Sequence, residues 1–309
     1  MTYLGELAAL GTAFFWAFTA IFFSKASQRA GAFNVNKVRL LMAVLIYAIV
    51  LLILNGSLFH QEINSSQLFW LGLSGFIGLV LGDLCIFKAL VIIGPRLTTL
   101  IFSTTPIMTS IIAWIFLGEK LGLLDVLGIT VTVAGVSWIV AAGRTDNQQL
   151  PNSSIKYADS GSYQKGVILA LGASLGQAVG LVLAKQGMSN SGSEIDPMLA
   201  SFVRMLIACA IIWLVSAFRG KLNEVALIFK DKATFKLTLS GSICGPFLGV
   251  WLSLLALNYI STGVAATLNA TVPIMVIPIM FIFYREKTSV RALAGAVIAV
   301  LGVALLFIT

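Results

Sequence analysis

The feature that most constrains this chain is an internal repeat, because a repeat fixes the architecture before any local detail. Residues 78–136 reappear at 245–303, 167 positions later, and the alignment needs no gap. The positions that match include Gly78, Gly82, Pro106, Glu119, Gly128 and Gly135, which fall on Gly245, Gly249, Pro273, Glu286, Gly295 and Gly302. Earlier segments repeat at smaller offsets, and Val38–Ala43 resembles Val203–Ala208. The chain is therefore a duplication whose length changes fall in loops.

The composition indicates a membrane protein. Apolar residues make up 59% of the chain and charged residues 10%, whereas soluble domains carry about 25% charged residues. A run of about 20 apolar residues spans a bilayer as a helix, because lipid offers the backbone no hydrogen-bond partner. Such runs occur at 4–24, 37–54, 68–91, 97–117, 122–142, 166–187, 198–217, 235–259, 262–283 and 289–308. We expect an all-α integral membrane protein with ten transmembrane helices.

The repeat and the expected helices together predict the domain organisation. Each half holds five helices, an odd number, so the second half enters the membrane from the opposite side. The two inverted five-helix repeats occupy 1–142 and 166–309. Between them, 143–165 is rich in Asn, Ser, Gln and Gly and indicates a flexible linker. Inverted repeats are typical of secondary transporters, which hold their substrate near the membrane midplane.

The distribution of Lys and Arg predicts the orientation. These residues gather in alternate loops, and the opposite loops hold only Lys120, so the basic loops and the linker are expected in the cytoplasm. Both termini are then outside, and the N-terminal segment is expected to be a retained first helix. The net charge of +8 reflects this topology and an attraction to anionic lipid, and it gives no support for nucleic-acid binding.

The sequence resembles the drug/metabolite transporter superfamily, and within it the EamA-like ten-helix family. The resemblance rests on the ten-helix plan, the GxxxG segments of the third helices, and Pro-Ile-Met followed by Glu-Lys in both halves. It assigns Pro106 and Pro273 to the family's helix-four proline, and Glu119 and Glu286 to its acidic residue at the following helix end. It implies a secondary transporter, more often an exporter, of a small metabolite such as an amino acid or a related compound. The implied location is a bacterial or archaeal cell (inner) membrane, which the chain crosses several times.

Glycines and prolines are the first candidates for a mechanical role. Gly78 and Gly82, like Gly245 and Gly249, place small residues on one helical face. Such faces allow close packing of helices, or let helices slide during gating.

Pro106 and Pro273 are expected in the middle of their helices, where proline removes a hydrogen bond and produces a kink. Neighbouring Ser, Thr and Asn side chains can satisfy the freed carbonyls. The alternative is that the kinked helices face the central cavity and hinge there.

Charged residues inside the membrane-spanning runs are the strongest indication of functional positions, because each charge costs at least about 2.5 kcal/mol at mid-bilayer. Asp83 is the only acid well inside an apolar run. It can form a structural ion pair with Arg39 or Lys88, or it can couple transport to a proton or cation. Its repeat partner is Val250, so this feature is not symmetric. Arg204 either reaches to the interface or faces a cavity, where it could bind a carboxylate or phosphate bidentately.

Other candidates for the cavity wall are polar and aromatic residues within the runs. They are Trp16, Tyr47, Gln177, Trp251, Asn258 and Asn269. Lys185, at the outer end of its helix, is expected to extend to the membrane interface. Cys85, Cys209 and Cys244 lie in apolar runs and indicate core residues. No metal-binding motif occurs, and no cofactor is expected.

The leading hypothesis is a transporter that works by alternating access. An uncoupled facilitator or a channel is the alternative, although nothing in the chain suggests the pore-lining rings of channels. An intramembrane enzyme would need a base beside its nucleophile, but the only histidine, His60, lies in a loop and Asp83 has no second carboxylate. The expected partners are a small-molecule substrate and the lipid bilayer, with the chain as a monomer or a homodimer.

Overall fold

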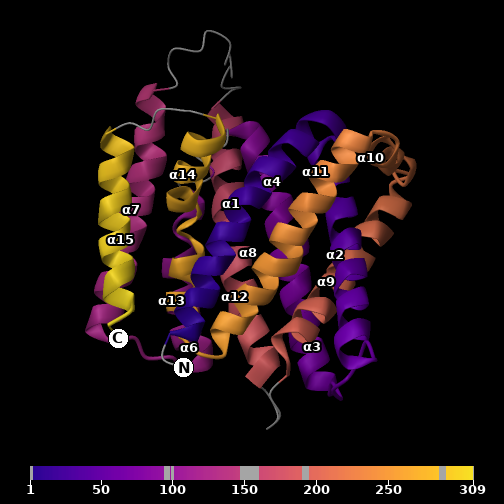
Figure 1. Cartoon of the computed structure of the whole chain (residues 1–309), viewed down its shortest axis with the longest axis horizontal. Helices are drawn as coiled ribbons and strands as arrows, with labels where there is room; N and C mark the ends of the chain where they lie inside the picture. The colour runs from indigo at the N-terminus through magenta and orange to yellow at the C-terminus, as the bar shows by residue number, and fades with distance from the viewer. Residues whose placement is uncertain are drawn as a thin grey trace.

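The structure is a computed structural model that describes residues 3–93, 98, 101–146, 160–189, 195–284 and 290–308. Every regular element in these ranges is a helix, as predicted, and the helices lie side by side in one bundle (Figure 1). Among the described residues, seven helices are long and apolar enough to cross a membrane, and shorter apolar helical segments occur at Thr105–Leu117, Thr262–Val276 (with a turn at 270–271) and Leu293–Leu306. The two chain ends lie at the same end of the bundle.

The first half contains the following elements. They are α1 (Leu4–Ala30), α2 (Ala32–Asn55), α3 (Ser65–Ser74), η1 (Gly75–Gly82), α4 (Asp83–Ile92), α6 (Thr105–Leu117) and α7 (Leu123–Asp146).

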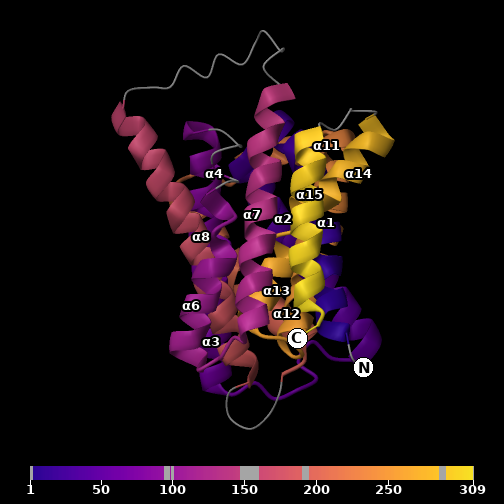
Figure 2. The same ribbon diagram turned by 90° about the vertical axis from the view of Figure 1, so that its left-hand side faces the viewer.

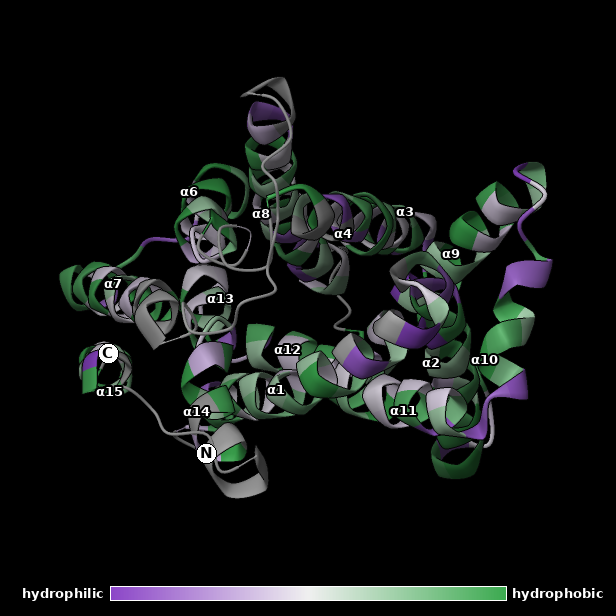
Figure 3. Ribbon diagram, turned by 90° about the horizontal axis from the view of Figure 1, so that it is seen from above, coloured by the Kyte–Doolittle hydropathy of each residue, from purple (hydrophilic) through white to green (hydrophobic). Residues whose placement is uncertain are grey.

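The second half repeats this order with an additional surface segment. Its elements are α8 (Ser160–Ser189), α9 (Pro197–Phe218), η4 (Asn223–Val225), α10 (Ala226–Lys230), α11 (Lys232–Ser242), η5 (Ile243–Gly249), α12 (Val250–Leu257), α13 (Thr262–Asn269), α14 (Val272–Tyr284) and α15 (Val290–Leu306). Seen from above, apolar residues cover the outer faces of the peripheral helices α6 and α7, and hydrophilic residues gather around α10 (Figure 3).

The third span of each half contains a π-helical segment, which the sequence analysis did not predict. Segment η1 separates α3 from α4, and η5 separates α11 from α12. Each segment contains the GxxxG pair of its half, and η5 also contains Pro246. Glycine permits the wider turn, and a proline without an N–H cannot complete a regular α-helical hydrogen bond. Single π turns inside α-helices are frequent at functional sites.

The spans expected at 97–117 and 262–283 are not continuous helices. A turn interrupts each span just before its proline, so Pro106 lies in the first turn of α6 and Pro273 in the first turn of α14. The expectation of a kinked, continuous helix was therefore wrong. Proline is better placed at the start of a helix, because the first backbone N–H groups have no partner within the helix.

Threonine hydroxyls satisfy carbonyls that these interruptions release. Thr105 Oγ1 donates to the carbonyl oxygen of Phe102 at 2.6 Å, and Thr271 Oγ1 donates to that of Leu268 at 2.7 Å. Polar side chains beside the prolines therefore support the backbone, as the sequence suggested, although they stabilise a break and not a kink.

Helices occupy both ends of the stretch 143–165, which the sequence analysis expected to be a linker. Helix α7 continues to Asp146 and α8 begins at Ser160, so both helices extend into this stretch (Figure 2). Residues 147–159 lie outside the described ranges.

Glycines set the closest helix contacts in the bundle. A Cβ atom on Gly180 of α8 would lie 3.0 Å from the Gly78 Cα, and one on Gly176 would lie 3.1 Å from the Gly82 Cα. In the second half, a Cβ on Gly245 would lie 2.6 Å from Thr19 of α1. The third span of each half thus packs through glycine against the first helix of the other half.

Helices α7 and α15 pack in the same way and lie side by side in Figures 1 and 2. We predict that Gly135→Ala will destabilise the protein by about 1–3 kcal/mol, the usual cost of overpacking. The added Cβ would lie 2.7 Å from the Ala299 Cα, so the two helices would have to separate. Thermal unfolding in detergent would measure the change.

The matched control is Gly172→Ala in α8, where Cys85 Sγ, at 3.7 Å, is the one described atom that the new Cβ would contact. That variant should keep or slightly raise the unfolding temperature, because alanine favours helix by up to about 1 kcal/mol. Equal unfolding temperatures for the two variants would contradict the packing argument.

Candidate functional site

Two adjacent cavities lie among residues from both halves of the chain. The first, which we call the apolar cavity, has a volume of about 260 Å³, and the second, the polar cavity, has about 250 Å³. Trp16, Phe102, Gln177 and Leu181 line both. The two cavities therefore share a wall, and we treat them as two parts of one candidate site.

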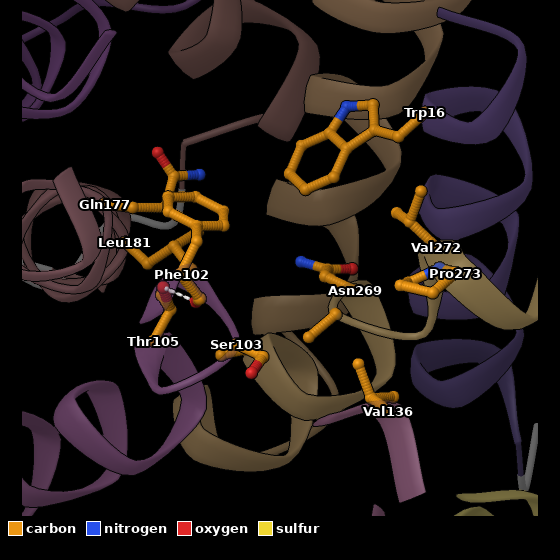
Figure 4. A pocket seen from close by; sticks show the side chains of 12 residues that line it. Trp16, Phe102, Ser103, Thr105, Val136, Gln177, Leu181, Asn269, Val272 and Pro273 are labelled. Carbon is orange, nitrogen blue, oxygen red and sulfur yellow. Dashed lines mark hydrogen bonds between the residues drawn. The ribbon is translucent and has the colours of Figure 1, made fainter. Parts of the chain in front are cut away.

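The apolar cavity lies where the two interrupted spans meet. Phe102, Ser103 and Thr105 come from the break before α6, and Asn269 and Pro273 come from the break between α13 and α14 (Figure 4). The irregular backbone of both halves thus lines this cavity, which matches the rule that non-helical backbone at membrane depth lines cavities or is covered by protein.

Trp16 and Gln177 extend into the apolar cavity from opposite sides, from α1 and α8 (Figure 4). The Trp16 indole packs against η5 so closely that a Cβ on Gly249 would lie 2.5 Å from Trp16 Cδ1. Glycine at position 249 therefore makes room for this indole.

Asn269 brings an unsatisfied polar atom to the wall. Its Nδ2 donates to Ser253 Oγ at 2.8 Å. Its Oδ1 is buried and has no hydrogen-bond partner among the described residues. A buried acceptor without a partner is unfavourable, so a ligand that supplies a donor would gain a hydrogen bond here.

The polar cavity contains the charged residues that the sequence singled out. Asp83 forms an ion pair with Arg39, and Arg39 Nε donates to Asn36 Oδ1 at 2.5 Å. The other partner that we considered, Lys88, is exposed on α4. The ion pair therefore joins α2 to α4 across the wall of the polar cavity.

Arg204 lies in α9 and also lines the polar cavity. Its side chain is almost completely buried, with a residue exposure of 4%. Its Nε has no hydrogen-bond partner within the described ranges. Of the two alternatives for Arg204, the structure shows the cavity-facing position and not an extension to the interface.

Three of the other candidates do not line either cavity. Tyr47 is fully buried behind the wall, and its hydroxyl lies 2.8 Å from the carbonyl oxygen of Phe247. Trp251 is half-buried against the main core, and Asn258 is exposed where α12 ends. Residue type alone did not separate these positions from Trp16 and Gln177.

The repeat would have found wall residues that the sequence analysis missed. Phe102 corresponds to Asn269 at the offset of 167, and Ser103 corresponds to Ala270. All four line the apolar cavity. Transferring the Asn269 candidate to its repeat partner would therefore have identified Phe102.

A polar cluster also joins the halves away from the cavities, and we call Glu119, Lys185 and Thr262 the seal cluster. Glu119 Oε2 accepts from the Thr262 N–H at 2.7 Å, and Glu119 Oε1 lies 2.8 Å from Lys185 Nζ. Thr262 Oγ1 also donates to Glu119 Oε1, and Lys185 Nζ donates to the carbonyl oxygen of Ile260. Lys185 therefore has partners within the protein, and its expected extension to the membrane interface stays a prediction. The repeat partner Glu286 lies outside the described residues.

The seal cluster lies at the end of the bundle that carries the chain termini. A Cβ on Gly5, in the first turn of α1, would lie 2.8 Å from Ile260. The cluster connects the α6–α7 turn of the first half to α8 and the start of α13 in the second half. Negative charge is favoured at the start of a helix, and Glu119 supplies it to α13.

Comparison with known proteins agrees with this architecture. A solved structure described only as "Crystal structure of protein" is similar to this chain with a TM-score of 0.73, covering 99% of this chain and 97% of that chain at 15% sequence identity. No curated protein matches the chain. The profile of the EamA-like transporter family matches residues 3–141 and 164–308, which confirms the resemblance seen in the sequence. The chain therefore belongs to the EamA-like transporter family and is a multi-pass membrane protein.

Proposed function

We propose that the protein is a secondary transporter that exports a small metabolite, such as an amino acid or a related compound, by alternating access. The observation that carries the proposal is that repeat-equivalent residues line the same two cavities. The equivalent pairs include Trp16 with Gln177, Arg39 with Arg204, Leu40 with Met205, Asp83 with Val250 and Phe102 with Asn269.

Equivalent residues from two halves meet at one place when that place lies on the axis relating the halves. In transporters built from inverted repeats, the substrate site lies on this axis near the midplane. Rocking of one half against the other then opens the site to one side of the membrane and closes it to the other. Two halves that were not related by such an axis would not be expected to place equivalent residues in the same cavity.

The proposed architecture has ten membrane spans. The seven long candidate spans and the three shorter apolar helices supply ten segments. We divide them into inverted repeats at 1–142 and 166–309, with both termini outside and the basic loops in the cytoplasm of the cell. A tag after residue 309 that reacts only from the cytoplasm would overturn this orientation.

The seal cluster is the proposed gate at the outer end, and the breaks at Pro106 and Pro273 are the proposed hinges. The ion pair and hydrogen bonds of Glu119 join the halves on that side. The glycine contacts between the third spans and the opposite first helices provide smooth faces along which the halves can move.

Efflux from proteoliposomes loaded with a mixed metabolite pool tests the function. The expected result is selective, saturable loss of one compound class, with counterflow when that compound is added outside. Loss no greater than that from loaded liposomes without the protein would reject the transporter proposal. Non-saturable flux without counterflow would favour the uncoupled facilitator or channel.

Tryptophan variants test whether the cavities are the transport site. We predict that Trp16→Phe will lower the efflux rate several-fold, because Trp16 lines both cavities. Trp251→Phe is the matched control, since Trp251 lines neither and should keep the wild-type rate once the amounts of folded protein are equalised. Equal effects of the two changes would place the substrate elsewhere.

Thiol labelling tests the seal cluster. In a background without Cys85, Cys209 and Cys244, Ala266→Cys reports on the apolar cavity. We predict that Glu119→Gln will raise the rate at which an impermeant maleimide labels this cysteine from the outer side by about 10-fold to 150-fold. The basis is that hydrogen bonds to charged groups contribute about 1.5–3 kcal/mol, and their loss favours the open state.

The control for the seal is Asp125→Asn. Asp125 accepts a hydrogen bond from the Gly122 N–H near the same end but contacts no residue of the seal cluster in the described structure. Its removal should leave labelling unchanged. Increased labelling from the cytoplasmic side after Glu119→Gln would reverse the assignment of this gate.

The Arg39–Asp83 ion pair is proposed to brace the wall of the polar cavity and not to couple transport to protons. Breaking one partner of a buried pair costs about 3–5 kcal/mol, whereas replacing both by apolar residues is often neutral. We therefore predict that Asp83→Leu will lower the unfolding temperature, and that adding Arg39→Met will restore it. Efflux by the double variant should keep the wild-type response to a pH gradient. Loss of that response in a folded double variant would make Asp83 a coupling residue.

A further inference from the structure

We propose that the transported compound carries an anionic group, such as a carboxylate, that binds Arg204, together with an apolar body that fills the apolar cavity. This inference rests on the proposed function and names its substrate class.

The two halves carry the same arginine but different partners for it. Arg39 and Arg204 occupy equivalent places in the segments Val38–Ala43 and Val203–Ala208. In the first half Arg39 forms an ion pair with Asp83. The position equivalent to Asp83 is Val250, which also lines the polar cavity. The second half therefore has the same cation but a valine at the position of the counterion.

The surroundings of Arg204 do not replace the missing acid. Among the described residues, no carboxylate forms an ion pair with Arg204, and its Nε has no hydrogen-bond partner. The nearby Gly78 and Gly75 belong to η1, and a Cβ on Gly75 would lie 2.5 Å from the Arg204 carbonyl oxygen. Because positions 75 and 78 are glycine, the backbone of η1 packs against Arg204, and no charged side chain extends toward it from these positions.

The charge of the polar cavity is therefore unbalanced. Of the described residues, two arginines and one aspartate line it, and the aspartate is already engaged by Arg39, which leaves one positive charge at Arg204. A buried charge without a counterion is strongly unfavourable, and a guanidinium binds carboxylates and phosphates through two parallel hydrogen bonds. A monoanionic ligand would supply the charge that Val250 does not.

The rest of the ligand must suit the neighbouring wall. Trp16, Phe102 and Leu181 line both cavities, and Pro273 and Val136 add further apolar surface on the far side. An apolar body can therefore extend from the anionic group at Arg204 into the apolar cavity. Asn269 Oδ1, which has no partner within the described part of the chain, offers one acceptor to a donor on that body.

The first measurement sorts the compounds that wild-type proteoliposomes export from a mixed pool by charge class. The pool contains matched compounds: 3-phenylpropionate, 3-phenylpropionamide, phenylalanine and 2-phenylethylamine, alongside a cell extract. The inference expects every exported compound to carry an anionic group. Export of the amide, the amine or other compounds without an anionic group would overturn the inference but leave the transporter proposal intact. Export of nothing would reject the proposed function itself.

The second measurement restores the missing acid. Val250→Asp places a carboxylate at the position equivalent to Asp83, where it can pair with Arg204 and compete with the substrate. We expect it to lower export of anionic compounds at least tenfold relative to Val250→Asn, which has nearly the same shape and no charge. This factor is the lower end of the range for hydrogen bonds to charged groups. Equal export by the two variants would overturn the assignment of Arg204.

Arg204 variants provide an independent check if Val250→Asp does not fold. Arg204→Lys keeps the charge but loses the paired geometry, and Arg204→Met loses both. Export of the anionic compounds should fall in the order wild type, Arg204→Lys, Arg204→Met, with folded protein equalised by size-exclusion chromatography. Export of anions by Arg204→Met at the wild-type rate would overturn the inference.

Discussion

The inability of lipid to hydrogen-bond a backbone determines where this chain departs from regular helix. Two kinds of departure occur inside the bundle: the breaks before Pro106 and Pro273, and the π-helical segments η1 and η5. All of them contribute residues to the walls of the two central cavities. The outer helices α7 and α15 are regular throughout the described residues, and of their described residues only Val136 of α7 lines either of these two cavities. Irregular backbone and the candidate site therefore occur together for one physical reason.

Much of the architecture could be predicted from the sequence, because hydropathy and the repeat report on long segments. The all-helical fold, the family and the approximate position of the apolar segments follow from these signals. The internal breaks could not be read in the same way, since an apolar run looks identical whether or not a turn interrupts it. The local pattern around Pro106, threonines beside a proline, fits a kink and a break equally well.

The candidate site was only partly predictable. Trp16, Gln177, Arg204 and Asn269 were expected in the cavity, and the structure places them in its wall. Tyr47 and Trp251 have similar side chains but face the core, because the direction of a helix face depends on its neighbours and not on residue type. The partner of Lys185 is Glu119, 66 positions away in the sequence, and no local pattern connects two such residues.

The unequal partners of Arg39 and Arg204 have a consequence for how such a protein can arise. Two separate, identical five-helix chains that meet across a two-fold axis must present the same residue at both equivalent positions. They would carry either two aspartates or two valines, and thus either no unpaired arginine or two. Once the halves are joined in one polypeptide, each position can change alone, and one half can keep Asp83 while the other has Val250. Fusion therefore permits a single, off-axis charge, which a symmetric assembly of copies cannot hold.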